Sequence, residues 1–155
     1  MESAHVSRSV IEDFLAQKRL AIVGVSHEPG KGFGNMARKE LAKKGYRLFV
    51  VHPTADEIDG AKCYRDLADV ADQVDGVVLV TPPAETERLV VRAAELGIRR
   101  VWMQQGAESE QAIRFCEARN LPVVHHECIL MFAEPAMWLH RAHRWVKGVS
   151  GELPH

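Results

Sequence analysis

Two groups of residues in this chain have types and spacing that could support chemistry. The first is the glycine-rich stretch 30–34, which joins an apolar segment ending at Ser26 to a helical pattern over 34–44. Such a loop brings backbone N–H groups and the positive end of a helix to one place, where a phosphate can bind. The second is the run 125–128, with two histidines, a glutamate and a cysteine. Its imidazole and thiol groups could bind zinc or take part in redox chemistry.

The glycine-rich stretch matches none of the common nucleotide motifs in full. A P-loop needs Ser or Thr after its lysine to hold magnesium, whereas Gly32 follows Lys31 here. Residues 32–37 fit the dinucleotide pattern G-x-G-x-x-G/A, but they begin well past the end of the preceding strand. NAD binding also needs an acidic residue at the end of the second strand, where this chain has His52. NADP stays open, because Lys31 or Arg38 could bind its 2′-phosphate.

Coenzyme A is a third possibility. Its phosphorylated ADP end needs backbone amides and a cation, and we expect Lys31 to bind the 3′-phosphate. Its pantetheine arm needs a long apolar groove along the carboxyl ends of parallel strands. We expect either Gln104 or Gln105 to face that edge. The predicted strand ends are residues 24–26, 52–53, 80–83 and 104–106. Pro53 and the pair Pro82 and Pro83 make rigid turns with few donors there, which suits a long, mostly apolar arm.

Length, composition and charge limit the partners of the protein. The chain has 155 residues, which predicts one domain, and its 46% hydrophobic and 26% charged residues are typical of a soluble globular protein. A formal net charge of −1 gives no overall field that would favour nucleic acid or an anionic membrane. The three cysteines form neither a CxxC pair nor a disulfide framework. We therefore expect a cytoplasmic protein with no nucleic-acid or membrane partner.

Hydrophobic periodicity predicts helices alternating with short apolar strands. The expected strands cover residues 20–25, 47–52, 76–81, 99–104 and 121–124, and the expected helices cover 7–18, 34–44, 66–72, 82–96 and 108–119. This order predicts an α/β fold, a Rossmann-like doubly wound domain with a mostly parallel five-stranded sheet.

An extra C-terminal helix is expected over 134–148, within an extension of about residues 131–150. Pro135 falls in its first turn and Gly148 at its end. Its apolar face could pack on the domain or on a second subunit, so we expect that a homodimer could form through it. A third kind of function follows from this helix, that of an interaction module that dimerises or docks through it.

Four motifs in the right order resemble those of a known family. They are residues 21–26, 52–64, 80–83 and 101–106. Over about residues 15–130, the sequence resembles the small CoA-binding proteins, whose fold is that of the N-terminal domain of the succinyl-CoA synthetase α subunit. His52 stands where this family commonly has Asn. The resemblance implies that the ligand is coenzyme A or an acyl-CoA.

The resemblance also implies roles for residues at the strand ends. Gly24 and Ser26 would lie against the phosphates, and Pro53 beside the adenosine. Val80, Thr81 and Pro82 would line the pantetheine arm. The full set of candidate binding residues is Gly24, Val25, Ser26, Lys31, Gly34, Asn35, His52, Pro53, Val80, Thr81, Pro82, Gln105 and Gly106.

We expect binding without catalysis. The ligase that shares this fold forms a phosphohistidine in a second domain, which this chain is too short to contain. The alternative is an NADP-dependent reductase or nicotinamide-nucleotide redox sensor, which the absence of a Tyr-x-x-x-Lys pair opposes. In the run 125–128, structural histidines and a buried cysteine are favoured over a zinc site completed by His140 and His143. A third interpretation makes Cys128 a redox thiol that forms a mixed disulfide with CoA. We assign no catalytic and no metal-binding residue.

Overall fold

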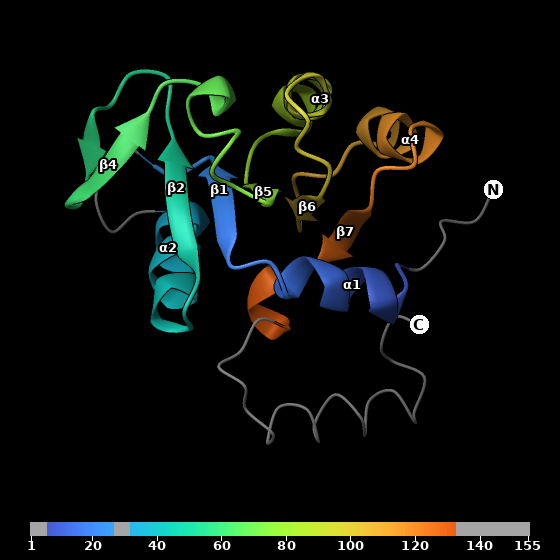
Figure 1. Ribbon diagram of the computed structural model, residues 1–155, viewed down its shortest axis with the longest axis horizontal. Helices are drawn as coiled ribbons and strands as arrows, with labels where there is room; N and C mark the ends of the chain where they lie inside the picture. The colour runs from blue at the N-terminus through green and yellow to red at the C-terminus, as the bar shows by residue number, and fades with distance from the viewer. Residues whose placement is uncertain (1–5, 27–31, 133–155) are drawn as a thin grey trace.

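A seven-stranded sheet forms the centre of the computed structural model, which describes residues 6–26 and 32–132 (Figure 1). The strand order is β3-β4-β2-β1-β5-β6-β7, and every neighbouring pair is parallel except β3 and β4. The strands are β1 (Arg19–Val23), β2 (Arg47–Val51), β3 (Glu57–Ile58), β4 (Ala61–Tyr64), β5 (Gly76–Leu79), β6 (Val101–Gln104) and β7 (Val123–Glu127).

Helices cover both faces of the sheet (Figure 1). On one face lie α1 (Arg8–Leu15), α2 (Gly32–Lys43) and the short helix η2 (Ile129–Met131). On the other lie η1 (Leu67–Asp69), α3 (Pro83–Glu95) and α4 (Glu110–Ala118). This arrangement confirms the predicted doubly wound, Rossmann-like α/β fold.

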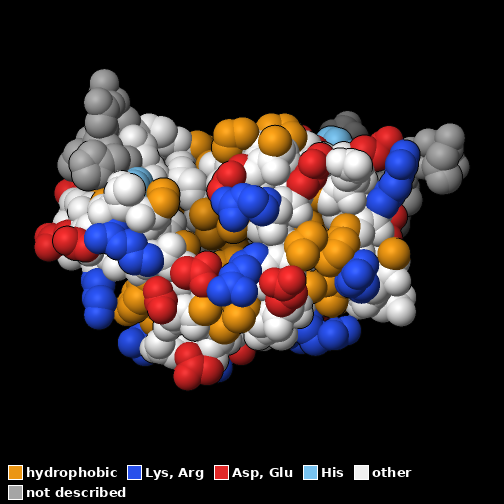
Figure 2. Space-filling model, turned by 90° about the horizontal axis from the view of Figure 1, so that it is seen from above, with side chains coloured by type: hydrophobic (Ala, Val, Ile, Leu, Met, Phe, Trp, Pro, Cys, Tyr) orange, Lys and Arg blue, Asp and Glu red, His pale blue; other side chains and the backbone are white. Residues whose placement is uncertain are grey.

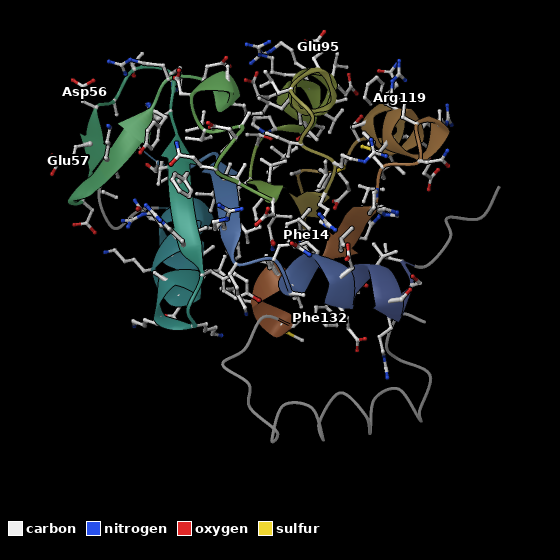
Figure 3. The ribbon with its side chains drawn as sticks, viewed as in Figure 1. Phe14, Asp56, Glu57, Glu95, Arg119 and Phe132 are labelled. Carbon is white, nitrogen blue, oxygen red and sulfur yellow. The ribbon has the colours of Figure 1, made fainter. Side chains whose placement is uncertain are left out.

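Alternate strand residues fill two separate cores. Leu20 and Ile22 pack with side chains from α1, α2 and η2. Ala21 and Val23 pack with side chains from α3 and α4. Trp102 is fully buried in the first core, and its ring lies 5.3 Å from that of Phe14 and 6.3 Å from that of Phe132, centroid to centroid. Figure 3 labels these two phenylalanines. Strands buried on both faces explain the nearly continuous apolar runs in the sequence.

The prediction of five strands was wrong, because residues 54–65 contain a small hairpin rather than only a connection. Asp59 and Gly60 adopt φ of 51° and 83°, as a two-residue Asp-Gly hairpin turn requires. Strand β4 then pairs in parallel with β2 and extends the sheet by two strands. Strands of two and four residues are too short to produce a clear alternation in the sequence.

Several predicted boundaries also change. The helix expected over 66–72 is one turn of 3-10 helix, because Asp66 and Asp69 close a capping box around it. Helix α2 starts at Gly32 instead of residue 34, and α1 ends at Leu15 instead of residue 18. The C-terminal helix expected over 134–148 lies outside the described residues. Within 6–26 and 32–132, no helix is long and apolar enough to cross a membrane.

The order of the strands creates a topological switch point at one edge of the sheet. From β1 the chain builds β2, β4 and β3 on one side, and then crosses to place β5 on the other side of β1. The connections after β1 and β5 therefore leave in opposite directions. Ligands of open α/β sheets bind at such a switch point, outside the carboxyl ends of the strands.

Candidate functional site

Gly24 marks the carboxyl end of β1 at the switch point. It has φ of 110°, and a Cβ added there would lie 2.0 Å from the carbonyl oxygen of Val80. The N–H of Val80 also donates to the carbonyl of Val23, at 2.8 Å. Gly24 is thus required for the close approach of the ends of β1 and β5. A larger side chain would first disturb this packing, so a Gly24→Val variant cannot report on a phosphate site alone.

Gly34 has a similar role on α2. A Cβ at this position would lie 2.8 Å from the carbonyl oxygen of Gly24 and 2.9 Å from the Cα of Val25. Glycine therefore lets the first turn of α2 rest directly on the end of β1. Val25 is buried in the core beneath, and its side chain does not reach the surface.

Ser26 lies at the start of α2. Its Cβ is 3.4 Å from a Cβ built on Gly32, the first residue of the helix. The first turn of α2 carries no acidic side chain, so the positive end of the helix is not neutralised by a carboxylate of that turn. Ser26 is half-buried, and Gly32 is exposed with φ of 81°. This arrangement is of the kind that accepts an anion, and the phosphate site stays a prediction. Lys31 lies outside the described residues.

Asn35 and Arg38 support this loop from inside. The Asn35 side chain is buried and its Nδ2 donates to the Ser26 carbonyl at 3.4 Å. Arg38 donates to Asn35 Oδ1 at 3.1 Å, and its guanidinium lies 3.7 Å from Asp59. Lys39 also pairs with Asp59, and this hydrogen bond is the main reason that the pKa of Asp59 is lowered. Asn35 therefore positions the loop, and Arg38 is held between α2 and the β3–β4 turn.

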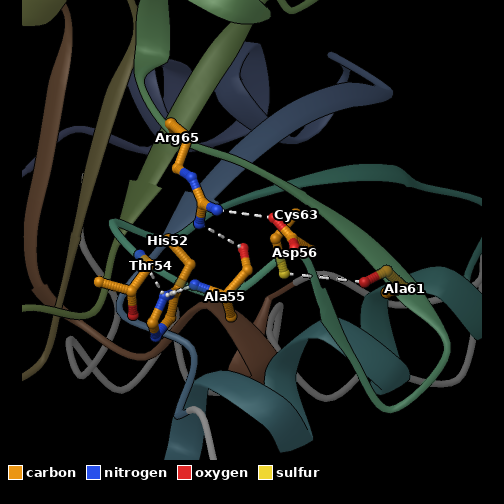
Figure 4. Close-up of polar contacts among 7 residues, drawn as sticks. All are labelled: His52, Thr54, Ala55, Asp56, Ala61, Cys63 and Arg65. Carbon is orange, nitrogen blue, oxygen red and sulfur yellow. Dashed lines mark hydrogen bonds and ion pairs between the residues drawn. The ribbon is translucent and has the colours of Figure 1, made fainter.

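His52 ends β2 and organises the turn that follows (Figure 4). Its Nδ1 accepts the backbone N–H groups of Thr54 at 3.1 Å and Ala55 at 2.9 Å. An Asn side chain makes the same kind of turn with its oxygen, which explains how His can replace it. Arg65 holds the turn from the other side by donating to the Ala55 carbonyl at 3.0 Å. Pro53 stays exposed on the turn, where it could flank a ligand.

The three residues that follow β5 differ in their burial and in their contacts. Thr81 is buried, and its hydroxyl is hydrogen-bonded to the hydroxyl of Thr86 at 2.7 Å. Val80 is half-buried, and Pro82 is exposed at the N-cap of α3. Val80 and Pro82 therefore offer apolar surface to a ligand, whereas Thr81 contributes mainly to the fold of the α3 start.

Gln104, the last residue of β6, and Gln105, which follows it, have different environments. Gln104 is buried, and its Oε1 accepts the N–H of Ile129 at 3.0 Å. Gln105 is exposed, and Gly106 is exposed with φ of 95° and nothing within 4 Å of an added Cβ. Of the two glutamines, Gln105 is the one at the open edge.

The end of β7 carries a β-bulge that the sequence did not reveal. Trp102 pairs with Val124 and Gln104 with Glu127, so two residues of β7 face one residue of β6. These two are His125, which is buried, and His126, which is exposed with φ of 62°.

The two histidine rings of the bulge contact each other. Their Nδ1 atoms lie 2.7 Å apart and the rings meet edge to face. The carboxylate of Glu108 fixes the bulge: it accepts the N–H of Gly106 at 2.7 Å and the N–H of His126 at 3.0 Å. Burial, and then the neighbouring His126, lower the pKa of His125.

Two residues of the run 125–128 are more exposed than the interpretation favoured from the sequence expects. His126 is exposed, and Cys128 is half-exposed instead of buried. Among residues 6–26 and 32–132, no three side chains of the metal-binding types come together. His140 and His143 lie outside the described residues.

A second concavity lies at the opposite edge of the sheet. It is an apolar groove of about 410 Å³ between the ends of α3 and α4. Figure 2 shows this face, with apolar side chains exposed between the helices, and Figure 3 shows Glu95 and Arg119, which belong to its rim. Its lining includes residues that precede β6 and β7, so it is separate from the carboxyl ends of the strands.

The fold and this edge together define a nucleotide-binding type of α/β domain. More specifically, the chain matches the CoA binding domain family over residues 18–134 and belongs to that family. The family favours CoA over NADP, the alternative that the sequence left open.

Known relatives agree with this assignment. The chain is 27% identical over 124 residues to the uncharacterized protein YneT of Bacillus subtilis, covering 79% of this chain and 91% of YneT. It is 32% identical over 82 residues to an ADP-forming acetate–CoA ligase of Methanocaldococcus jannaschii, covering 53% of this chain and 12% of the ligase. A conserved hypothetical protein from Pyrococcus furiosus has a similar structure, with a TM-score of 0.68, 38% identity, and coverage of 73% and 97%.

Proposed function

We propose that this protein binds coenzyme A or an acyl-CoA along the carboxyl edge of its sheet, without ligase activity of its own. The observation that carries the proposal is the switch point, where the end of β1 meets the first turn of α2, in a chain of the CoA binding domain family. The glycines there bring backbone close together, and the positive end of α2, with no acidic side chain in its first turn, suits the phosphates of CoA.

The remaining strand ends fit the other parts of the ligand. Pro53 offers an exposed rigid surface for the adenosine. Val80 and Pro82 offer apolar surface to the pantetheine arm, which would continue toward Gln105 and Gly106. Lys31 remains our predicted partner for the 3′-phosphate.

Binding without catalysis is supported by the relation to the ligases. The matched part of the Methanocaldococcus jannaschii enzyme is 12% of its length, so the match leaves out most of that enzyme. A cytoplasmic location is supported by the three free cysteines.

The experiment compares two variants of nearly equal size at Ser26. Ser26→Asp places a carboxylate beside the first turn of α2, where it would repel phosphates but should not harm the helix. Ser26→Asn is the neutral control. By isothermal titration, we expect CoA to bind the wild type and Ser26→Asn with affinities within a few-fold, and to bind Ser26→Asp at least about tenfold more weakly, or about 1.4 kcal/mol.

The same titrations with acetyl-CoA, NADP and ADP test the class of ligand. We expect CoA and acetyl-CoA to bind more tightly than ADP, because the pantetheine arm adds contacts. At 100 times its dissociation constant, CoA should add about 2.7 kcal/mol of stability in thermal unfolding. Tighter binding of NADP than of CoA, or equal CoA affinity for the two Ser26 variants, would contradict the proposal.

A further inference from the structure

We propose that His126 binds the thiol of coenzyme A and accepts its proton, so that CoA bound to the protein ionises to a thiolate at lower pH than free CoA. This inference rests on the proposed function, because it needs CoA to lie along the carboxyl edge. It goes beyond that function in assigning a chemical role to the histidine pair. The observations are the position of the bulge, the link between Gly106 and His126, and the contact between the two rings.

The length of the ligand matches the position of the bulge. Strands β1, β5, β6 and β7 are consecutive neighbours in the sheet. Neighbouring strands lie about 4.8 Å apart, so the end of β7 is about 14 Å from the end of β1. The arm of CoA between the diphosphate and the sulfur is as long as about four extended residues, which is also about 14 Å. With its diphosphate at Ser26, CoA therefore brings its thiol to the end of β7.

Glu108 connects the path of the arm to the histidine pair. One carboxylate oxygen accepts the N–H of Gly106 and the other accepts the N–H of His126. The two backbone segments are thereby held within the reach of one carboxylate. A pantetheine arm that passes Gly106 meets His126 next, and this side chain is exposed.

The ring of His126 is oriented by that of His125. His125 is buried and the pKa of its imidazole is lowered, so it stays neutral and its Nδ1 can accept a hydrogen bond. His126 then donates from Nδ1 across the 2.7 Å contact. In this tautomer the Nε2 of a neutral His126 carries a lone pair and acts as a base. A buried group that fixes the tautomer of a base is the arrangement used to activate nucleophiles.

Acidic side chains lie on the elements packed around the pair. Glu108 is engaged by two backbone N–H groups, and Glu117 of α4 raises the pKa of His125 less than burial lowers it. On α1, which packs against β7, Asp13 is paired with Arg100. Glu127 follows the pair at the end of β7, and Cys128 comes next, before η2.

The proposed step is a single proton transfer. The proton leaves the sulfur of CoA for Nε2 of His126, the electron pair of the S–H bond stays on sulfur, and a thiolate–imidazolium pair forms. An adjacent imidazolium lowers the pKa of a thiol. An acyl-CoA has no such proton, so the pair stabilises free CoA and not its thioesters.

The experiment follows thiolate ultraviolet absorbance of the CoA complex as a function of pH. The complex with acetyl-CoA serves as the blank, because it contains the same protein groups and no thiol. We expect the CoA thiol to ionise at least about one pH unit lower in the complex than in solution, a tenfold gain in thiolate below the midpoint. CoA affinity should also depend on pH in this range, whereas acetyl-CoA affinity should not.

The variants separate this role from a structural one. His126→Asn suits the left-handed backbone and removes the base, so the midpoint should return to that of free CoA while acetyl-CoA affinity stays within a few-fold. Glu117→Gln is the control and should leave the midpoint lowered.

The outcomes distinguish this inference from the proposed function. CoA that binds with the midpoint of free CoA overturns the role of His126 and leaves the proposed function standing. A lowered midpoint that survives in His126→Asn also overturns the inference. A protein that binds neither CoA nor acetyl-CoA overturns both.

Discussion

Histidines stand at two separate places along the carboxyl edge, after β2 and within the bulge of β7, and their rings have different partners. His52 uses Nδ1 to accept two backbone N–H groups, so its ring belongs to the turn. His126 contacts the ring of His125, while its own backbone is held by Glu108. In the second region a carboxylate replaces the imidazole as the acceptor for the backbone. The comparison shows that a histidine becomes available for chemistry where another group satisfies the neighbouring backbone.

The largest expected effect is on the stability of a Gly24 variant. Gly24 follows β1, which lies between the strands of the two histidine regions. Gly24→Ala should lower the free energy of unfolding by about 3–5 kcal/mol, because the new Cβ would collide with the carbonyl of Val80 at a strained φ. Gly97→Ala is the control: its φ is 82°, but the space around it is open, so we expect a loss of about 1 kcal/mol. Urea unfolding measures both. Equal losses would mean that the ends of β1 and β5 can separate at little cost.

Mutations in the two histidine regions should change the free energy of unfolding of the protein by different amounts. His52→Ala leaves the N–H groups of Thr54 and Ala55 without their acceptor, and should cost about 1–2 kcal/mol of unfolding free energy. His52→Asn keeps an acceptor and should recover most of this loss. His126→Asn should change stability by less than about 0.5 kcal/mol. A larger loss in His126→Asn than in His52→Ala would reverse the comparison.

The pH dependence of stability should report on His125. Its pKa is lowered in the folded protein, so below the ordinary value of 6.5 the unfolded chain binds the proton and the folded chain does not. The contribution of His125 is therefore fully present above pH 6.5 and decreases as the pH falls below it. Melting temperatures of the wild type and His125→Asn between pH 7.5 and 5 should converge toward the acidic end. A parallel decline in both proteins would contradict this.

The smallest effect is on the reactivity of thiols near the two regions. Burial raises the pKa of Cys63, which follows the His52 turn on β4, and raises that of Cys116 to about 12. Cys128, next to the bulge, is half-exposed. With iodoacetamide at pH 8, we expect Cys128 to react in the folded protein and the other two to react only after unfolding. Peptide mass analysis would identify the modified residue.

Much of the fold was predictable because its signals are local. Buried parallel strands give continuous apolar runs, and glycines mark where β1 ends and α2 begins. The hairpin of β3 and β4 was missed because its strands are too short for a periodic pattern.

The site was predicted less completely. Gly24 and Gly34 were placed correctly at the switch point, but their contacts with Val80 and Val25 depend on tertiary structure. The bulge, its left-handed His126 and the bond from Glu108 have no sequence signal, since none of these residue types is specific to a bulge.

A single additional residue separates β7 from a regular strand. Side chains of a regular strand alternate between faces, so in unbroken register with β6 His126 would lie opposite Gln104 and share the face of Val124, in the core beneath α1 and η2. With the bulge, His126 is exposed while Glu127 takes the position opposite Gln104. A shift of one residue in the pairing of two strands thus decides whether a side chain at this strand end is buried or exposed, without altering any other strand of the sheet.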